Sequence, residues 1–169
     1  MQPRDAKFLL DFFLPQLVFE QTRTKAVLLA IPPNQGDYRP APQSRSAFEL
    51  ARHLAGTEMW FLDGVLNHEF AEDDDLEADL PNTVAGFADW YDRHFFARLP
   101  RLEALSGEHL AMPFNYIGVR NDPAVTYLSL TLRHTAHHRG QLSAYLRPMG
   151  AKVPAIYIES ADASLRSIA

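Results

Sequence analysis

Four long stretches, in which apolar residues recur every three or four positions, are separated by short proline-rich or polar breaks. This periodicity is that of an α-helix with one face toward a core, whereas a half-buried β-strand would alternate every second residue. We find no convincing pair of strands, no internal repeat and no low-complexity run in the sequence. The pattern predicts an all-α, up-down four-helix bundle with helices over about 5–30, 46–67, 83–102 and 123–148.

Local signals mark where three of these helices begin. Ser46 and Glu49 fit a capping box, in which each residue satisfies a backbone N–H of the other. Asn82 or Thr83 is expected to cap the third helix. Asp122 is expected to cap the fourth helix with its carboxylate.

Prolines and loops supply further expectations. Pro15 predicts a kink or a delayed start in the first helix, and Pro100 predicts a weakened or early end of the third. The acidic run Glu72–Asp75 is expected to be a solvated loop, and residues 107–123 a long connection without strands. The apolar segment 153–158 should pack back on the bundle.

Composition limits the functional classes. With 169 residues the chain is predicted to be one domain spanning 1–169. A net charge of −5 and the lack of a basic stripe argue against nucleic-acid binding. No apolar run is long enough to span a membrane, and no secretory signal is evident, so a cytoplasmic protein is expected. Because the chain has no cysteine, any thiol chemistry must use a thiol carried by a small molecule.

Histidines carry the strongest functional signal. His134 and His138 are four residues apart on a predicted helix, so their side chains project from one face about 40° apart. Two such imidazoles can hold one divalent metal ion, and His53 on the second predicted helix is available as a third ligand. His134 and His137 could also converge, but we favour His134 with His138 and expect His137 at the rim or beside a ligand.

Other polar residues have simpler interpretations. Capping already explains Glu49, whereas Glu58 is not an obvious ligand and is expected to reach a neighbouring helix or act behind the ligands. Arg139 is interpreted as a surface or ion-paired arginine, with contact to an anionic substrate as the alternative. Structural roles are expected for the remaining histidines, which are His68, His94 and His109.

Several of these motifs, in this order, resemble the DinB/YfiT-like family of metal-dependent four-helix bundles. Tyr38-Arg39-Pro40 precedes the second helix, and His53-Leu54 with Glu58 follows. The matching block His-x-x-x-His-Arg-Gly-Gln-Leu runs from His134 to Leu142, and the Met149-Gly150 turn and the tail 153–157 complete the resemblance over nearly the whole chain. The resemblance implies that His53, His134 and His138 form a metal triad, with zinc or nickel as the expected ion, and that the protein is a homodimer.

Some relatives in that family are S-transferases or isomerases that use low-molecular-weight thiols such as bacillithiol, mycothiol or glutathione. The leading hypothesis is therefore a metal-dependent enzyme that acts on a small-molecule substrate, with thiol transfer ranked above hydrolysis by resemblance alone. The alternative is a non-catalytic metal-binding or small-ligand-binding stress-response protein, because no unambiguous general acid or base is evident. A third hypothesis is a purely structural dimer, to which the aromatic residues between Trp90 and Phe96 could contribute an interface.

Overall fold

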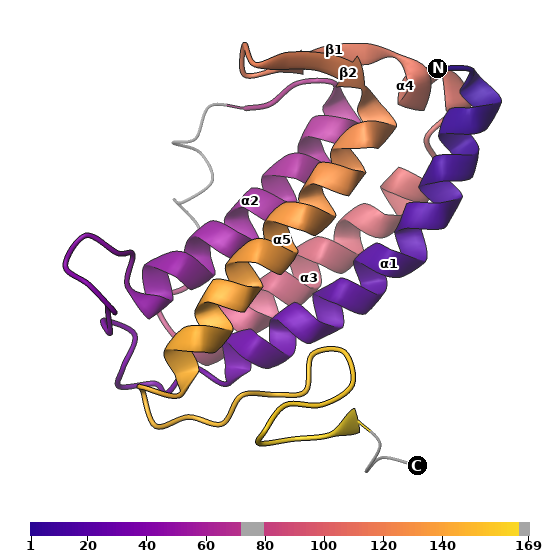
Figure 1. Cartoon of the computed structure of the whole chain (residues 1–169). Coiled ribbons are helices and arrows are strands. Elements are labelled where there is room, and N and C mark those ends of the chain that lie inside the picture. Colours follow the sequence, from indigo (N-terminus) through magenta and orange to yellow (C-terminus); the bar gives the residue numbers. More distant parts are fainter. Residues whose placement is uncertain (72–79, 166–169) are drawn as a thin grey trace.

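The computed structural model describes residues 1–71 and 80–165 of the chain. The described residues form a mainly helical fold with one small antiparallel sheet (Figure 1). In chain order the elements are α1 (Pro3–Leu29), α2 (Ala47–Asn67), α3 (Val84–Glu103), α4 (Gly107–Ala111), β1 (Pro113–Tyr116), β2 (Arg120–Pro123) and α5 (Ala124–Leu146). The all-α prediction is therefore confirmed in outline, while the predicted absence of a strand pair is wrong.

The four long helices lie side by side, and the hairpin covers one end of α2 and α5 (Figure 1). Helix α5 packs against both α1 and α2, and α3 packs against the same two helices. The core between them is apolar and includes Leu10, Leu54, Tyr91, Phe95 and Leu142, all fully buried. Among the described residues, no helix is long and apolar enough to cross a membrane.

The capping box at the start of α2 forms as the sequence predicts. Ser46 Oγ accepts a hydrogen bond from the Glu49 N–H at 3.2 Å, and the Glu49 carboxylate accepts one from the Ser46 N–H at 2.8 Å. Thr83 caps α3, because its hydroxyl oxygen accepts a hydrogen bond from the Gly86 N–H at 3.2 Å. These ends are set by contacts within four residues, which sequence can reveal.

The predicted cap of α5 is wrong. Pro123 occupies the N-cap position without a side-chain hydrogen bond, and the Asp122 carboxylate pairs instead with Arg120. Asp122 lies in β2, opposite Phe114, so its backbone belongs to the hairpin. The start of α5 is fixed by this pairing and by the geometry of proline.

Neither Pro15 nor Pro100 ends its helix, which differs from the expected delayed start of the first helix and early end of the third. Helix α1 is continuous through Pro15, and α3 continues past Pro100 to Glu103. Both prolines are exposed, so water can satisfy the backbone carbonyl that loses its intrahelical partner. The packing of each helix against its neighbours outweighs the local cost of the proline.

The connection between α3 and α5 is structured rather than irregular. Strands β1 and β2 pair from Pro113 with Pro123 to Tyr116 with Arg120. Gly118 has a φ of 77° in the turn between them, a conformation that glycine adopts without strain. The Tyr127 hydroxyl of α5 donates to the Phe114 carbonyl at 2.8 Å and accepts from the Asp122 N–H at 3.1 Å, which ties the hairpin to the helix.

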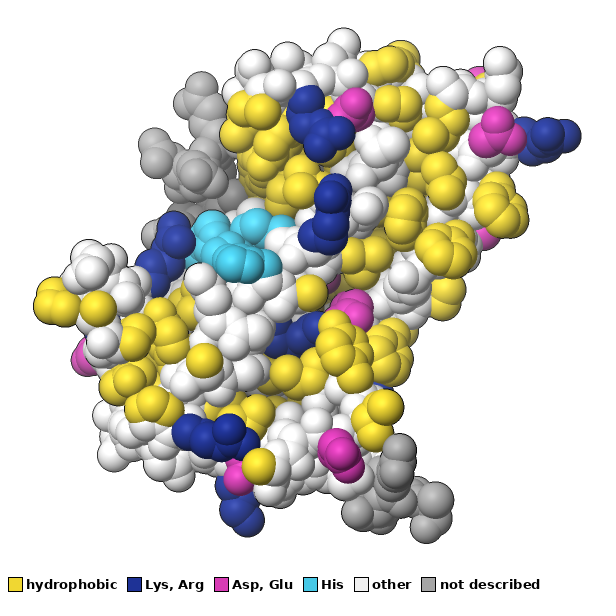
Figure 2. All heavy atoms as spheres, in the orientation of Figure 1, with side chains coloured by type: hydrophobic (Ala, Val, Ile, Leu, Met, Phe, Trp, Pro, Cys, Tyr) yellow, Lys and Arg dark blue, Asp and Glu magenta, His cyan; other side chains and the backbone are white. Residues whose placement is uncertain are grey.

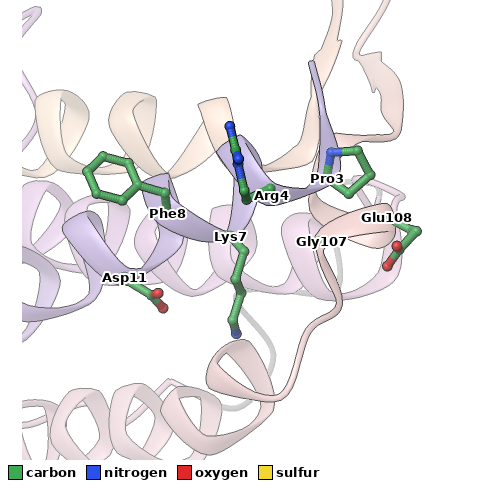
Figure 3. A pocket seen from close by; sticks show the side chains of 7 residues that line it. All are labelled: Pro3, Arg4, Lys7, Phe8, Asp11, Gly107 and Glu108. Atoms are coloured by element: carbon green, nitrogen blue, oxygen red, sulfur yellow. The ribbon is translucent and has the colours of Figure 1, made fainter.

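Close backbone contact joins α4 to the start of α1. A Cβ on Gly107 would lie 2.4 Å from the Pro3 carbonyl oxygen, so glycine is required there. Lys7 donates to the carbonyl oxygens of Glu103, the last residue of α3, and of Leu105, at 2.8 Å and 3.3 Å. In Figure 3 the Lys7 side chain points away from Arg4, toward that part of the chain.

The tail after α5 returns to the bundle, as expected. Ala155 is buried, Val153 and Ile156 pack against the core, and the ring of Tyr157 stacks on Phe19 of α1 at 6.3 Å between centroids. The acidic run Glu72–Asp75 lies outside the described residues.

Candidate metal centre

The structure brings together three histidines from two neighbouring helices. His53 lies on α2, and His134 and His138 lie one turn apart on α5. One ring nitrogen from each residue can be chosen so that all three lie within 4.8 Å of one another. The three rings are half-buried, and Figure 2 shows a patch of histidine at the surface between basic side chains.

Hydrogen bonds orient two of the rings toward each other. The Nε2 atoms of His53 and His138 lie 3.2 Å apart. On the far side of the rings, His138 Nδ1–H donates to Gln141 Oε1 at 2.7 Å, and His53 Nδ1 lies 3.3 Å from the Thr57 hydroxyl. A proton held on Nδ1 leaves the Nε2 lone pair free, which is how outer hydrogen bonds prepare imidazoles for a metal ion.

Burial makes two of the three rings weaker bases than a free imidazole. Burial, reinforced by repulsion from His138 and His53, lowers the pKa of His134 to about 3. Burial also lowers the pKa of His138, although its hydrogen bond to Gln141 opposes the shift. Both rings are therefore neutral at pH 7, the protonation state in which imidazole binds metals.

The geometry and the donor set fit a divalent metal ion. Two imidazole nitrogens on one tetrahedral zinc are about 3.3 Å apart, close to the spacing of His53 and His138. His134 Nδ1 is buried and has no hydrogen-bond partner among the described residues, a cost that a metal ion bound through this nitrogen would offset. Two nitrogens on opposite sides of one zinc ion are at most about 4.2 Å apart. The three histidine nitrogens lie within 4.8 Å of one another, so a small side-chain movement would bring them all within reach of one ion.

His137 is exposed and does not belong to this cluster, in agreement with the preferred pairing. Its ring contacts His138 at 4.8 Å between centroids, at the rim of the group.

The other histidines have structural contacts. His68 and His109 stack at 3.7 Å, and each lies within hydrogen-bonding distance of a backbone carbonyl oxygen, while His94 stacks on Trp90 at 4.3 Å.

The hairpin contributes an aromatic boundary that the sequence did not reveal. Phe61 of α2 stacks on Tyr116 of β1 at 5.9 Å and makes an edge contact with His134 at 5.7 Å. Trp60 and Phe70 extend this aromatic group around Tyr116. Aromatic side chains therefore form the boundary of the cluster on the hairpin side.

A buried carboxylic acid lies one and a half turns after His53. Glu58 is 1 % exposed and accepts a hydrogen bond from the Tyr91 hydroxyl of α3 at 2.7 Å. Burial raises the pKa of Glu58 to about 7, against the opposing effect of the Tyr91 hydrogen bond. Sequence reasoning foresaw that Glu58 could reach a neighbouring helix, but not that it would be buried in the core.

Arg139 is neither a surface residue nor open to a substrate. It is 1 % exposed, forms an ion pair with Glu20 of α1 and donates to the Tyr157 hydroxyl at 2.7 Å. A further bond from Arg139 Nη1 reaches Thr24 Oγ1 at 3.3 Å. The alternative in which Arg139 contacts an anionic substrate is therefore wrong, because its guanidinium is turned into the core.

Comparisons with known proteins agree with this fold. The chain is similar in structure to a DinB-like protein from Bacillus cereus ATCC 10987, with a TM-score of 0.73 and 23 % identity over 86 % of this chain and 95 % of that one. A DinB-like protein from Bacillus subtilis gives a TM-score of 0.72 and 21 % identity over 85 % and 96 % of the two chains. None of the curated proteins matches the sequence. The family model described as the DinB family matches residues 7–164, and the chain therefore belongs to the DinB family.

Proposed function

We propose that this protein binds one divalent metal ion, zinc or nickel, through His53, His134 and His138, in an up-down bundle of its four long helices. The observation that supports this best is the convergence of three imidazoles from α2 and α5, two of which have a pKa lowered by burial. Three imidazoles leave coordination positions open, as catalytic zinc sites do, whereas structural sites are usually closed by four protein ligands.

We further propose that the protein is a metal-dependent enzyme acting on a small molecule, with a low-molecular-weight thiol as the favoured cosubstrate. A bound divalent metal supplies Lewis acidity, which lowers the pKa of a coordinated water or thiol. The chain itself has no cysteine, so the sulfur would come from the cosubstrate. Thr57 and Gln141 hold the two facing imidazoles in place, and the aromatic residues beside His134 exclude water.

A second candidate function is metal or small-ligand binding without catalysis. The observation in its favour is the position of Glu58, the buried acid nearest in sequence to His53. Its carboxyl group is hydrogen-bonded to Tyr91 inside the core. A group enclosed in this way is badly placed to transfer protons to a substrate at the histidine cluster.

Metal analysis by mass spectrometry tests the site. Untagged wild-type protein purified without chelators is expected to carry about one equivalent of metal, because imidazole nitrogens are good ligands for zinc and nickel. His138→Ala should lose that metal, while His137→Ala, which removes an exposed neighbour outside the cluster, should retain it. Negligible metal in wild-type protein after reconstitution, or equal loss in both variants, would overturn the proposed site.

Activity assays then separate the two functions. The metal-loaded protein is mixed with bacillithiol, mycothiol or glutathione and a panel of electrophiles, and thiol consumption is followed. Turnover that disappears in His138→Ala supports the enzyme. A metal-loaded protein that is silent throughout, yet retains an organic ligand through purification, supports the binding protein.

We also propose that the protein is a homodimer. Of the aromatic residues on α3 considered for an interface, Trp90, Tyr91 and Phe95 are buried in the core. The exposed aromatic side chains lie instead mainly on α1, where Phe8 and Phe12 are 70 % and 56 % exposed. Sedimentation equilibrium gives the mass directly, and a monomer at micromolar concentration would contradict the proposal.

A further inference from the structure

We propose that a small pocket beside the histidine cluster binds an oxyanion, a carboxylate or phosphate group, of the substrate. This inference rests on the proposed function, because it assigns the part of the substrate that does not react. The pocket has a volume of about 270 Å³ and is lined by Arg45, Glu49, Arg52 and His53. It therefore shares His53 with the candidate metal centre.

The charge of the pocket favours an anion. Among the described residues of its lining, the one carboxylate is that of Glu49, which accepts hydrogen bonds from Arg39 at 2.6 Å and from the Ser46 N–H at 2.8 Å. The lining also contains two guanidinium groups, those of Arg45 and Arg52, against this one carboxylate. Arginine presents several N–H donors in a planar fork, which matches the oxygens of a carboxylate or phosphate.

The two arginines differ in how they are held. Arg52 is half-buried, and its Nη1 donates to the Leu80 carbonyl at 3.4 Å, which keeps the side chain beside α2. Arg45 is exposed, and no hydrogen bond or ion pair with a described residue engages its guanidinium.

The size and position of the pocket limit what it can hold. A drug-sized ligand usually occupies about 300–1,000 Å³, so this space suits a single charged group rather than a whole cosubstrate. Because His53 lines the pocket and also faces His138, an anion held there would place the adjoining atoms of the substrate at the metal. The arginines would thus be binding residues that orient the substrate and do not react.

A larger pocket elsewhere lacks these properties. It has a volume of about 460 Å³ between the start of α1 and α4, and none of the clustered histidines lines it (Figure 3). Its basic residues, Arg4 and Lys7, extend in opposite directions, and Lys7 is bound to the carbonyl oxygens of Glu103 and Leu105. Its charges therefore do not converge on one ligand.

Sulfate is the probe, because it resembles a phosphate group and competes weakly for zinc or nickel. Its binding is followed by ¹H–¹⁵N correlation spectra at constant ionic strength, with metal-loaded and metal-free protein. Arg45→Gln is expected to weaken sulfate binding at least about tenfold, the usual effect of losing charge-assisted hydrogen bonds. Arg52→Gln should weaken it as well.

Arg133→Gln is the matched control. Arg133 adjoins His134 and is exposed, but its Nε donates to the Ser129 carbonyl at 3.2 Å and it does not line the pocket. This variant removes the same charge and should change sulfate binding by less than about twofold, because long-range attraction is screened by salt. An equal loss in Arg133→Gln and Arg45→Gln, or no loss in either, would overturn the oxyanion site.

Metal content measured on the same samples separates this proposal from the proposed function. Protein that holds metal but shows no saturable sulfate binding contradicts the oxyanion site alone. Protein that holds no metal, yet binds sulfate through Arg45, contradicts the metal centre and leaves the anion pocket supported. Circular dichroism checks that each variant keeps its helices, which is expected because Arg45 is exposed.

Discussion

Replacing Glu58 with glutamine is expected to stabilise the protein at alkaline pH and to leave it nearly unchanged in acid. The Glu58 carboxyl group is 1 % exposed, and burial raises its pKa from 4.5 to about 7. Glutamine has nearly the same shape, cannot ionise, and offers a carbonyl oxygen to the Tyr91 hydroxyl that now donates to Glu58.

The size and sign of the effect follow from the difference between folded and unfolded protein. The folded state binds the proton of the Glu58 carboxyl group more tightly than the unfolded state does. The protonated carboxyl group therefore stabilises the folded protein fully below pH 4.5, and this stabilisation is lost as the pH rises to about 7. A pKa difference of this size corresponds to about 3 kcal/mol. Glu58→Gln avoids that loss, so its advantage over wild-type protein should be under about 1 kcal/mol at pH 5 and about 3 kcal/mol at pH 8.5.

Urea denaturation of metal-free protein at several pH values measures this difference in the free energy of unfolding. The histidines titrate equally in both proteins, so their effects cancel when the two curves are subtracted. Glu103→Gln is the control, because Glu103 is exposed and its substitution should change stability by less than about 0.5 kcal/mol at each pH. A gap between Glu58→Gln and wild-type protein that stays constant from pH 5 to 8.5 would refute a buried, proton-binding Glu58.

Four further perturbations test other parts of the structure. Gly64→Ala should destabilise the protein by about 1–3 kcal/mol in thermal melts, because a Cβ there would lie 2.3 Å from the Phe70 ring. Gly140→Ala, whose Cβ would meet no atom within 4 Å, should stabilise the protein by up to about 1 kcal/mol. Arg139→Ala should cost about 3–5 kcal/mol in urea denaturation, because it leaves Glu20 without its buried partner; a cost under about 1 kcal/mol would contradict the ion pair. Zinc at one hundred times its dissociation constant should raise the free energy of unfolding by about 2.7 kcal/mol, and a chelator should reverse the gain; unchanged melting would count against a site in the folded protein.

Features that depend on neighbouring residues could be predicted from sequence. The capping box of Ser46 and Glu49 and the Thr83 cap join groups only three residues apart. The residue types at those positions were therefore enough to predict both caps. The convergence of His134 and His138 follows from the helical repeat alone. The approach of His53 to these two residues does not follow from the helical repeat, because it depends on the packing of α2 against α5.

Features that depend on distant residues could not be read in this way. The strands of the hairpin have only four residues each, and β2 has no apolar alternation. The hairpin is held to α5 by the Tyr127 hydroxyl. Sequence position placed Arg139 next to a candidate ligand, but its partner Glu20 is 119 residues away. The raised pKa of Glu58 likewise arises from burial of its side chain in the core, which no local pattern reveals.

The buried polar residues connect the long helices in a way that bears on the candidate metal centre. Glu58 of α2 receives a hydrogen bond from Tyr91 of α3, Tyr91 interacts with Thr24 of α1, and Thr24 is bonded to Arg139 of α5. Apolar contacts tolerate sliding between helices, whereas hydrogen bonds require particular atoms to meet. A slide of α5 along α2 by one residue, about 1.5 Å, would separate donors from acceptors and also displace His138 from His53. The buried chain of hydrogen bonds therefore opposes the same displacement that would spoil the 3.2 Å approach of the two imidazoles.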